Sequence, residues 1–373
     1  MKKLLCVVLS MIMLLSVGSV AFAEEVSLES MGVTYLVPDG KYVNDFSSDD
    51  AVSIADVEAM MTSADYEAVK EKGLTAVICM NEYLTEWAKA VVNGIKAVFD
   101  PLGIEVITIM DAGFSAPQGA MDLEQAVEMK PDIILCYDQE PDTVKDSTKK
   151  AAAQGTKITF FACAAADCVN NVDYFGVVSG DNYTMGYLSG KRIAEAIGGE
   201  GEVAVVPTNF MSNDMRTRYE GALAALGEYE GITLITDQSS GFSTEECANL
   251  GEQIIMAHPN LKGYWGQWDE LSVAAVSAMK SLGFDVVGSG PDLASSNTAA
   301  NMAADGGFVG TGAFSAYSLG VGGGLCAVAA QAGKEVPDQV TIPIVEVTKE
   351  NILDTYFMLF HDELPKQIIK MLS

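Results

Sequence analysis

The stretch from Leu74 to Gly103 constrains the fold more than any other part of the sequence. Leu74 to Met80 form a short, continuously apolar run, which is typical of a parallel strand covered by helices on both faces. The next apolar residues recur at helical spacing, and Pro101 with Gly103 ends the predicted helix. Ile104 to Met110 predict a second strand, so the stretch is a strand–helix–strand unit with a right-handed crossover.

The turn after the first strand is the first candidate for contact with a ligand. Ligands of open parallel sheets bind outside the carboxyl ends of the strands, and residues 81–87 lie at that end. The turn carries two aromatic side chains, Tyr83 and Trp87, and the hydroxyl group of Thr85. We therefore expect these three residues to face a ligand.

The chain begins with the pattern of an export signal. Lys2 and Lys3 precede an apolar run from Leu4 to Val20, and Ala21-Phe22-Ala23 matches an A-x-A cleavage site. Residues 1–23 are therefore predicted to be a signal peptide cleaved near Ala23, with an uncleaved membrane anchor as the alternative. After cleavage no membrane span is expected, and the mature protein is predicted to be periplasmic, secreted or at the cell surface.

The charge balance excludes some classes of partner. The formal net charge is −29 for the whole chain, and loss of Lys2 and Lys3 with the signal peptide makes it −31. A surface this acidic repels nucleic acids and anionic membranes, so neither is an expected partner.

Six cysteines remain after cleavage, and three of them have an apolar sequence context. Cys79, Cys136 and Cys163 lie in or at the ends of apolar runs, where a free cysteine packs as a small hydrophobic residue. A disulfide between Cys163 and Cys168 and free thiols at both positions are open alternatives in an exported protein.

Beyond residue 103, predicted strands and helices keep alternating in two series. The first series ends with a strand at 175–179, and the second opens with a strand at 203–207. With 373 residues, the chain has room for two domains, and two such series predict two doubly wound parallel-sheet lobes. The flanking regions are expected to be an irregular extension at 24–73 with a short helix near 54–61, a last strand near 340–347, and a tail at 348–373 with one helix near its end.

Three short motifs carry a family resemblance. They are Gly180-Asp181-Asn182-Tyr183 with Gly186, Arg216-Thr217-Arg218-Tyr219-Glu220-Gly221, and Ala257-His258-Pro259 followed by Gly266-Gln267-Trp268-Asp269-Glu270. In order and spacing they resemble the type I periplasmic binding proteins of the ribose-binding-protein-like group, over about residues 74–350. The resemblance implies two lobes, a three-crossing hinge and a ligand-binding cleft between the lobes.

Each motif also has a physical interpretation. Asp181 and Asn182 can cap the helix that follows them, and Gly186 is expected to let that helix approach the sheet closely. Arg218 is a permanently charged fork near the start of a helix, which suits carboxylate, phosphate or vicinal hydroxyl groups. A surface salt bridge is the alternative role for Arg218.

The resemblance implies aromatic ligand contacts on both lobes. Trp87 falls on the stacking position of the first lobe, with Thr85 nearby, and Phe242 falls on the aromatic position of the second lobe. Trp268 falls where the family often has an amide, and Phe314 falls near a hinge residue that is often glutamine. Aromatic faces stack on the C–H faces of sugar rings, so a polar ring is the expected ligand, and core packing is the alternative for each aromatic residue.

Two departures from the group leave the ligand open. The end of the fourth strand reads Phe161-Ala162-Cys163-Ala164, where many sugar binders have an Asp-Arg pair. The usual acidic position after residue 288 is displaced, and Asp292 in the loop 289–297 is taken as its substitute. A deoxy, methylated or otherwise less polar sugar is expected, with a nucleoside stacked between Trp87 and Trp268 as the alternative.

The sequence lacks the motifs of common enzymes. Its two histidines are His258 and His361, and it has no Gly-x-Ser-x-Gly elbow, phosphate-binding loop or paired Cys/His metal spacing. We therefore expect no enzymatic activity, no cofactor and no metal. A DNA-binding regulator would carry a basic helix-turn-helix, whereas residues 24–73 are acidic.

The resemblance also implies a mechanism and a division of the chain. The lobes should close on the ligand, and the closed form should deliver it to an ABC-type permease, or to a signalling receptor if the protein is a sensor. The protein is expected to be a monomer. The expected crossings lie near 179–181, 312–315 and 341–343, and the expected parts are a first lobe of 74–180 and 314–341, a second lobe of 181–313 and 342–355, and a tail of 356–373.

Overall fold

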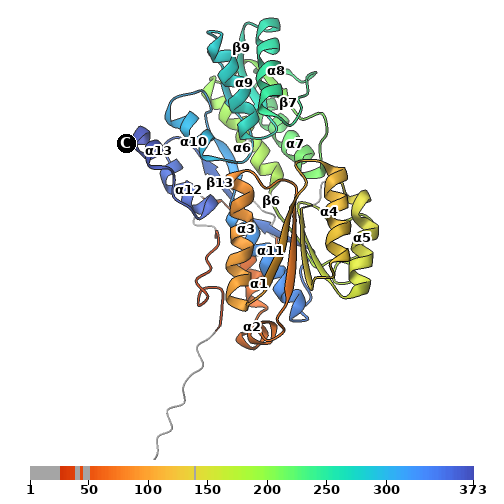
Figure 1. The fold of residues 1–373 in the computed structure, drawn as a ribbon. Coiled ribbons are helices and arrows are strands. Elements are labelled where there is room, and N and C mark those ends of the chain that lie inside the picture. Colours follow the sequence, from red (N-terminus) through yellow and green to blue (C-terminus); the bar gives the residue numbers. More distant parts are fainter. Residues whose placement is uncertain (1–25, 38–42, 45–50, 138–139) are drawn as a thin grey trace, which may run out of the picture.

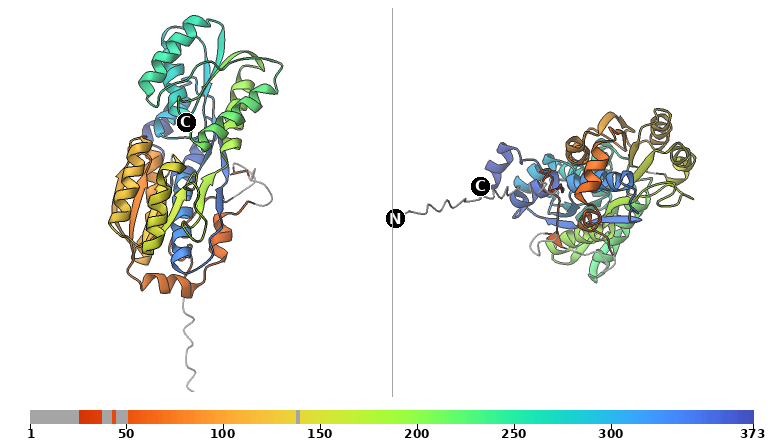
Figure 2. Two further views of the ribbon diagram at one scale, coloured as in Figure 1. Left: turned by 90° about the vertical axis from the view of Figure 1, so that its right-hand side faces the viewer. Right: turned by 90° about the horizontal axis from the view of Figure 1, so that it is seen from below.

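The computed structural model describes residues 26–37, 43–44, 51–137 and 140–373 (Figure 1). The predicted signal peptide, residues 1–23, lies outside the described residues. The described chain forms two lobes, each a parallel sheet with helices on both faces, and a small antiparallel sheet where the lobes meet (Figures 1 and 2). The predicted fold class is therefore confirmed.

The larger sheet belongs to the first lobe and has six parallel strands. Its side chains alternate between two cores, so that Ile78 packs on one face while Val77 and Cys79 pack on the other. Burial of both faces explains why the predicted strands read as continuous apolar runs. The strand order is β12 (Gln339–Ile342), β6 (Val177–Gly180), β5 (Lys157–Phe161), β4 (Ile133–Tyr137), β2 (Thr75–Met80) and β3 (Glu105–Asp111).

Two pairs of helices cover this sheet. One face carries α3 (Glu86–Phe99), which leads into the 3-10 turn η1 (Asp100–Leu102), and α11 (Ala316–Gln331). The other face carries α4 (Ala116–Glu128) and α5 (Pro141–Gln154). The N-terminal segment adds α1 (Ile54–Ala59) and α2 (Ser63–Lys70), which pack on α11 and keep it buried along almost its whole length.

The N-terminal segment contains one more helix than expected. The sequence analysis gave a single helix near 54–61, whereas the structure ends α1 at Ala59 and begins α2 at Ser63. Thr62 and Asp65 form a capping box at the start of α2, in which each side chain meets the backbone of the other residue. This Thr-x-x-Asp pattern is the sequence signal for the second helix.

The second lobe has a parallel sheet of four strands between two pairs of helices. The strand order is β10 (Val287–Ser289), β9 (Leu261–Gly266), β7 (Glu200–Val206) and β8 (Gly231–Ile235). The helices are α6 (Asn182–Ala196), α7 (Asn213–Gly227), α8 (Thr244–Ala257), α9 (Asp269–Ser281) and the shorter α10 (Ser296–Ala303).

At Gly186, helix α6 packs closely against helix α7, whereas a close approach to the sheet was expected. A Cβ atom there would lie 1.8 Å from the carbonyl oxygen of Arg218, on α7, so the close approach is between two helices and not between a helix and the sheet. The expected cap at the start of α6 is present, since the side chain of Asp181 accepts a hydrogen bond from the N–H of Thr184 at 3.0 Å.

The chain passes between the lobes three times. It leaves the large sheet after β6 to enter α6, returns from β11 (Thr311–Phe314) into α11, and leaves again after β12. The single strand expected at 340–347 is two strands, because Pro343 has no N–H to donate and the chain changes sheet there. Beyond Pro343, β13 (Ile344–Val347) pairs antiparallel with β11 and with β1 (Val43–Asn44).

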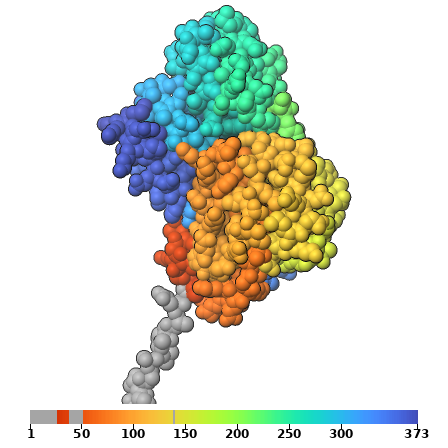
Figure 3. Space-filling view, viewed as in Figure 1, coloured from red at the N-terminus to blue at the C-terminus, as the bar shows by residue number. Residues whose placement is uncertain are grey.

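The C-terminal segment forms two helices, where one was expected. They are α12 (Ile352–Phe360) and α13 (Lys366–Leu372), and the expected boundary at residue 355 falls inside α12. Helix α12 contacts α3 and α11 of the first lobe, and α13 contacts α10 of the second, so the segment lies beside both lobes (Figure 3). Among the described helices, none is both long and apolar enough to cross a membrane, and no disulfide joins Cys163 to Cys168.

Candidate functional site

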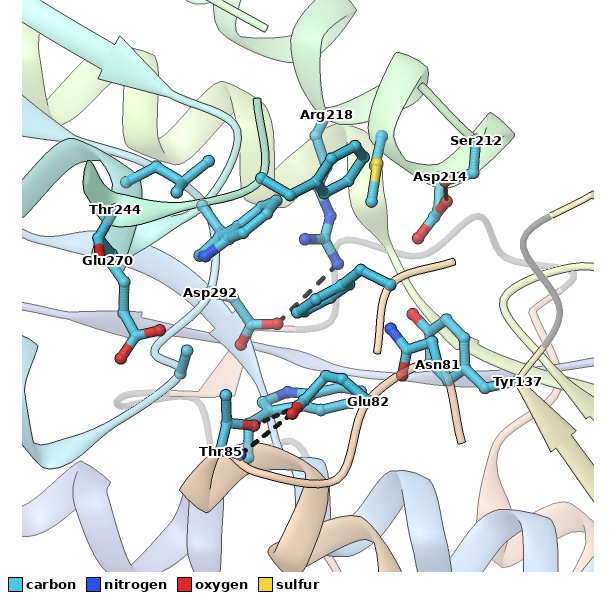
Figure 4. Close-up of a pocket in the computed structure, with 17 residues that line it drawn as sticks. Asn81, Glu82, Thr85, Tyr137, Ser212, Asp214, Arg218, Thr244, Glu270 and Asp292 are labelled. Carbon is cyan, nitrogen blue, oxygen red and sulfur yellow. Dashed lines mark hydrogen bonds and ion pairs between the residues drawn. The ribbon is translucent and has the colours of Figure 1, made fainter. Parts of the chain in front are cut away.

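A cavity of about 130 Å³ lies between the two lobes. One water needs roughly 10–15 Å³ of such space, so the cavity has room for a small organic molecule. Its walls come from the carboxyl ends of strands in both sheets, where the sheet topology predicts a ligand. The lining residues are Asn81, Glu82, Thr85, Trp87, Phe114 and Tyr137 from the first lobe, and Ser212, Asp214, Met215, Arg218, Phe242, Thr244, Trp268, Glu270, Leu271, Asp292 and Ala294 from the second (Figure 4).

The carboxylate of Glu82 holds the turn after β2. It accepts hydrogen bonds from the N–H groups of Leu84 and Thr85, at 2.7 and 3.1 Å, and from the hydroxyl group of Thr85. The Thr85 oxygen accepts a further bond from the N–H of Ala88 at 3.1 Å and so caps α3. The hydroxyl of Thr85 therefore serves the turn itself, and this turn sets the position of Trp87 at the cavity wall.

Trp87 is locked in place but keeps an unpaired donor. The rings of Tyr137 and Phe314 meet it edge to face, with centroid distances of 5.9 and 6.0 Å and interplanar angles of 77° and 74°. Its indole Nε1 is buried and has no hydrogen-bond partner among the described residues, and the same holds for Oδ1 of Asn81. A buried polar atom normally has a partner, so this donor and this acceptor are exceptions in residues that line the cavity.

An aromatic stack joins the lobes on another wall of the cavity. Phe114, from the first lobe, stacks on Phe242 and Trp268 of the second, with centroid distances of 6.0 and 5.7 Å and interplanar angles of 25° and 17°. Phe114 has a φ of 60°, a left-handed conformation that costs a bulky residue about 1–3 kcal/mol. Its N–H donates to the carbonyl oxygen of Asn81 at 2.7 Å, which helps to hold this conformation.

Arg218 and Asp292 lie together on the second-lobe side of the cavity (Figure 4). Nε of Arg218 donates to Oδ1 of Asn182 at 2.7 Å, and its Nη2 lies 3.9 Å from Oδ2 of Asp292. Both side chains are buried. Burial raises the pKa of Asp292 from 3.8 to about 6, and the guanidinium of Arg218 only partly opposes this shift. Desolvation of the Asp292 carboxylate therefore outweighs its attraction to Arg218.

Hydrogen bonds beside the cavity also link the lobes. The N–H of Trp87 donates to the carbonyl oxygen of Ala294 at 3.1 Å. The carboxylate of Glu86 accepts bonds from the N–H and the hydroxyl of Ser296, at 2.6 and 2.8 Å, and from the hydroxyl of Tyr356 at 2.9 Å. The start of α3 is thus fastened to the start of α10 and to α12, so the structure has its lobes closed on each other.

The structure brings most of the expected site residues to the cavity. Thr85, Trp87, Arg218, Phe242, Trp268 and Asp292 line it. Tyr83 and Phe314 are not among the lining residues of the cavity. Tyr83 packs against the core of the first lobe. Phe314 is 3% exposed, and its ring packs edge to face against the ring of Trp87.

Several lining residues were missed by the sequence analysis. Asn81 and Tyr137 stand at the carboxyl ends of β2 and β4, and Phe114 follows β3, so the rule that placed Trp87 could also have identified them. Asp214 and Glu270 lie in the first turns of α7 and α9. Acidic residues are common there as complements of the helix dipole, so no separate sequence signal marks them as site residues.

The family follows from a comparison with known proteins. Residues 76–335 match the family model described as periplasmic binding protein domain, which covers more than half of the chain. The chain therefore belongs to the periplasmic binding protein family, and the predicted family is confirmed.

Curated relatives are binding proteins for small solutes. The chain is 24% identical over 229 residues to the D-apiose import binding protein of Actinobacillus succinogenes, covering 61% of this chain and 72% of the relative. It is 23% identical over 195 residues to the ribose import binding protein of Bacillus subtilis, covering 52% and 62%. It is 22% identical over 222 residues to the xylitol-binding protein of Mycolicibacterium smegmatis, covering 57% and 59%.

Solved structures share the fold over most of the chain. A solute-binding protein of Actinobacillus succinogenes with bound D-allose has a TM-score of 0.66 and 24% identity, covering 74% of this chain and 98% of that one. A solute-binding protein of Agrobacterium vitis with bound α-D-tagatopyranose has a TM-score of 0.70 and 18% identity, covering 77% and 98%. These likenesses support the two-lobe fold.

Proposed function

We propose that this chain is an exported solute-binding protein that holds one small polar ring between its lobes and delivers it to an ABC-type permease. The observation that carries the proposal is the convergence of Trp87, Phe242, Arg218 and Asp292, from two lobes, on one cavity. Aromatic faces suit the C–H faces of a sugar ring, whereas guanidinium and carboxylate groups bind its hydroxyls. Relatives named for apiose, ribose and xylitol favour a sugar or polyol as the solute.

Each side chain then has a definite role. Trp87 and Phe242 stack on the ring, with Trp268 and Phe114 extending the aromatic surface. Arg218 and Asp292 hold hydroxyl oxygens and hydrogens. The function requires no cofactor and no chemical step, and among the described residues no cluster of three or more His, Cys, Asp or Glu side chains could hold a metal ion.

The proposed cycle uses the three crossings as a hinge. The first lobe takes 74–180 and 314–341, and the second takes 181–313 and most of 342–355, with the C-terminal helices beside both. A ligand stabilises the closed form only through contacts that it makes better there than in the open form. The mature protein is proposed to act as a monomer outside the cytoplasm, after cleavage near Ala23.

A melting-temperature screen tests the proposal. A solute that binds only the folded protein must raise its melting temperature, so pentoses, hexoses, deoxysugars, polyols and nucleosides are screened in parallel. A shift with a sugar or polyol is expected. The second candidate function is the binding of a nucleoside, which the five aromatic residues of the cavity support. A shift with nucleosides alone would favour this second function. A shift with amino acids or peptides alone would contradict both functions.

A further inference from the structure

The cavity carries more negative than positive charge. Four carboxylates line it, and Arg218 is the one cationic side chain among its described lining residues. Arg218 already serves Asn182 and Asp292. The other three carboxylates, Glu82, Asp214 and Glu270, have no ion-pair partner among the described residues.

Helix ends offset only part of this charge. Glu82 lies just before α3, and Asp214 and Glu270 lie in the first turns of α7 and α9. A helix N-terminus acts as roughly half a positive charge, whereas each ionised carboxylate carries a full negative one. Glu82 is also bonded through both of its oxygens, but Asp214 and Glu270 each accept one serine hydroxyl through one oxygen. The cavity therefore keeps a negative potential that no described side chain neutralises.

One side of the cavity carries a carboxylate oxygen that lacks a donor. Ser212 donates to Oδ1 of Asp214, and no described residue donates to its Oδ2. Figure 4 shows Asp214 on the same side of the cavity as Asn81 and Tyr137, with Glu270 on the opposite side. Burial and the charge of Asp214 raise the pKa of Tyr137, which agrees with this proximity.

We propose that the solute is a small polar ring that carries a protonated amino group, and that this ammonium group binds to Asp214 beside Tyr137. The inference rests on the proposed solute-binding function and narrows its ligand to aminated sugars or aminated polyols. An ammonium group has donors only, so it can donate to Oδ2 of Asp214, which has no donor among the described residues. Its charge offsets the carboxylates, and the nearby aromatic rings attract it through their faces.

A neutral ring fits the same site less well. When the lobes close, water leaves and each carboxylate that lacks a positive partner is costly to bury. Hydroxyl groups can donate to Asp214, but they bring no charge. The charge of the cavity therefore favours an aminated ring over its neutral counterpart of the same shape.

Matched pairs of solutes test the inference by calorimetric titration of the mature chain. The pairs are D-glucosamine with D-glucose, D-galactosamine with D-galactose, and an aminated inositol with myo-inositol. In at least one pair the aminated member should bind roughly tenfold more tightly or better, and N-acetylation, which removes the charge, should abolish that advantage. If neutral members bind as tightly as aminated ones in every pair, the inference fails while the proposed function stands. If no member of any pair binds but another sugar or polyol of the melting-temperature screen does, the inference fails and the proposed function stands; if no sugar or polyol of either set binds, both fail.

Substitutions locate the ammonium site. Asp214→Asn should lower the ratio of aminated to neutral affinity roughly tenfold, because it removes the charge and keeps the shape. Asn81→Asp adds a carboxylate on the same side of the cavity and should raise the ratio, so the test holds even if the Asp214 variant folds poorly. Asp285→Asn makes the same charge change at a side chain that is 99% exposed and outside the cavity, so it should leave the ratio unchanged. An unchanged ratio in both cavity variants would overturn the inference.

Discussion

The indole N–H of Trp87 allows a ligand contact to be told apart from a core contact. Trp87→Phe keeps an aromatic ring between Tyr137 and Phe314 and removes the N–H. Since Nε1 has no acceptor among the described residues, the empty protein loses only apolar contact, and we expect its free energy of unfolding to fall by about 1 kcal/mol. A bound solute would lose one hydrogen bond, also worth about 1 kcal/mol, which is roughly a fivefold rise in Kd.

Trp265 provides a matched control. It is fully buried in the second lobe, outside the cavity lining, and its Nε1 donates to Oγ of Ser189 at 2.8 Å. Trp265→Phe breaks this existing bond, so it should destabilise the protein by about 1–3 kcal/mol more than Trp87→Phe does. Its Kd for the solute should stay that of the parent.

The assay combines thermal unfolding of the empty protein with calorimetric titration of the solute found by the melting screen. Trp87→Ala should give the largest loss of affinity at this position. Loss of a buried aromatic anchor should weaken binding by about 2 kcal/mol or more, which is roughly a thirtyfold rise in Kd. The reasoning is refuted if Trp87→Phe binds as tightly as the parent. It is also refuted if Trp265→Phe weakens binding as much as Trp87→Phe.

Three further predictions concern charged groups. Arg218→Ala should weaken solute binding by about 2 kcal/mol, because it leaves a buried acceptor unpaired, and titration would contradict this if Kd did not change. Glu86→Gln should favour the open form, because it weakens the hydrogen bonds to Ser296 and Tyr356. Solution scattering without solute should then show a larger radius of gyration for the variant than for the parent. Equal radii of gyration would argue against such a link between the lobes. The raised pKa of Asp292 means that its folded form binds a proton more tightly than its unfolded form. Its stabilising effect is therefore full below pH 3.8 and is lost as the pH rises to about 6. Asp292→Asn should remove this loss of stability. The prediction is contradicted if the melting temperatures of parent and variant change in parallel between pH 4 and pH 7.

Residues that directly follow a clear strand could be placed at the cavity from the sequence. Trp87 lies in the turn region after an apolar run, and the carboxyl ends of such runs meet at one edge of a parallel sheet, whereas Phe242 and Asp292 were predicted from the family resemblance. The alternation of strands and helices likewise predicted the two lobes, because burial of both sheet faces leaves a strong apolar pattern. These features depend on local pattern and on general topology.

Other features depend on contacts between distant segments. The place of Phe114 depends on a left-handed backbone and on rings of the opposite lobe, which local sequence does not specify. Pro343 breaks an apparently continuous strand because each half finds a partner in a different sheet. Phe314 was expected to contact the ligand. At the end of β11 its ring instead packs edge to face against the ring of Trp87 and does not line the cavity.

Solution scattering from the mature chain, with and without the solute that raises its melting temperature most, tests the central claim most directly. The claim is that a small polar solute is trapped by closure of two lobes about a three-crossing hinge. If so, saturating solute should lower the radius of gyration toward that of the closed structure (Figure 1). An unchanged radius of gyration, in a protein that demonstrably binds the solute and is open without it, would contradict the claim.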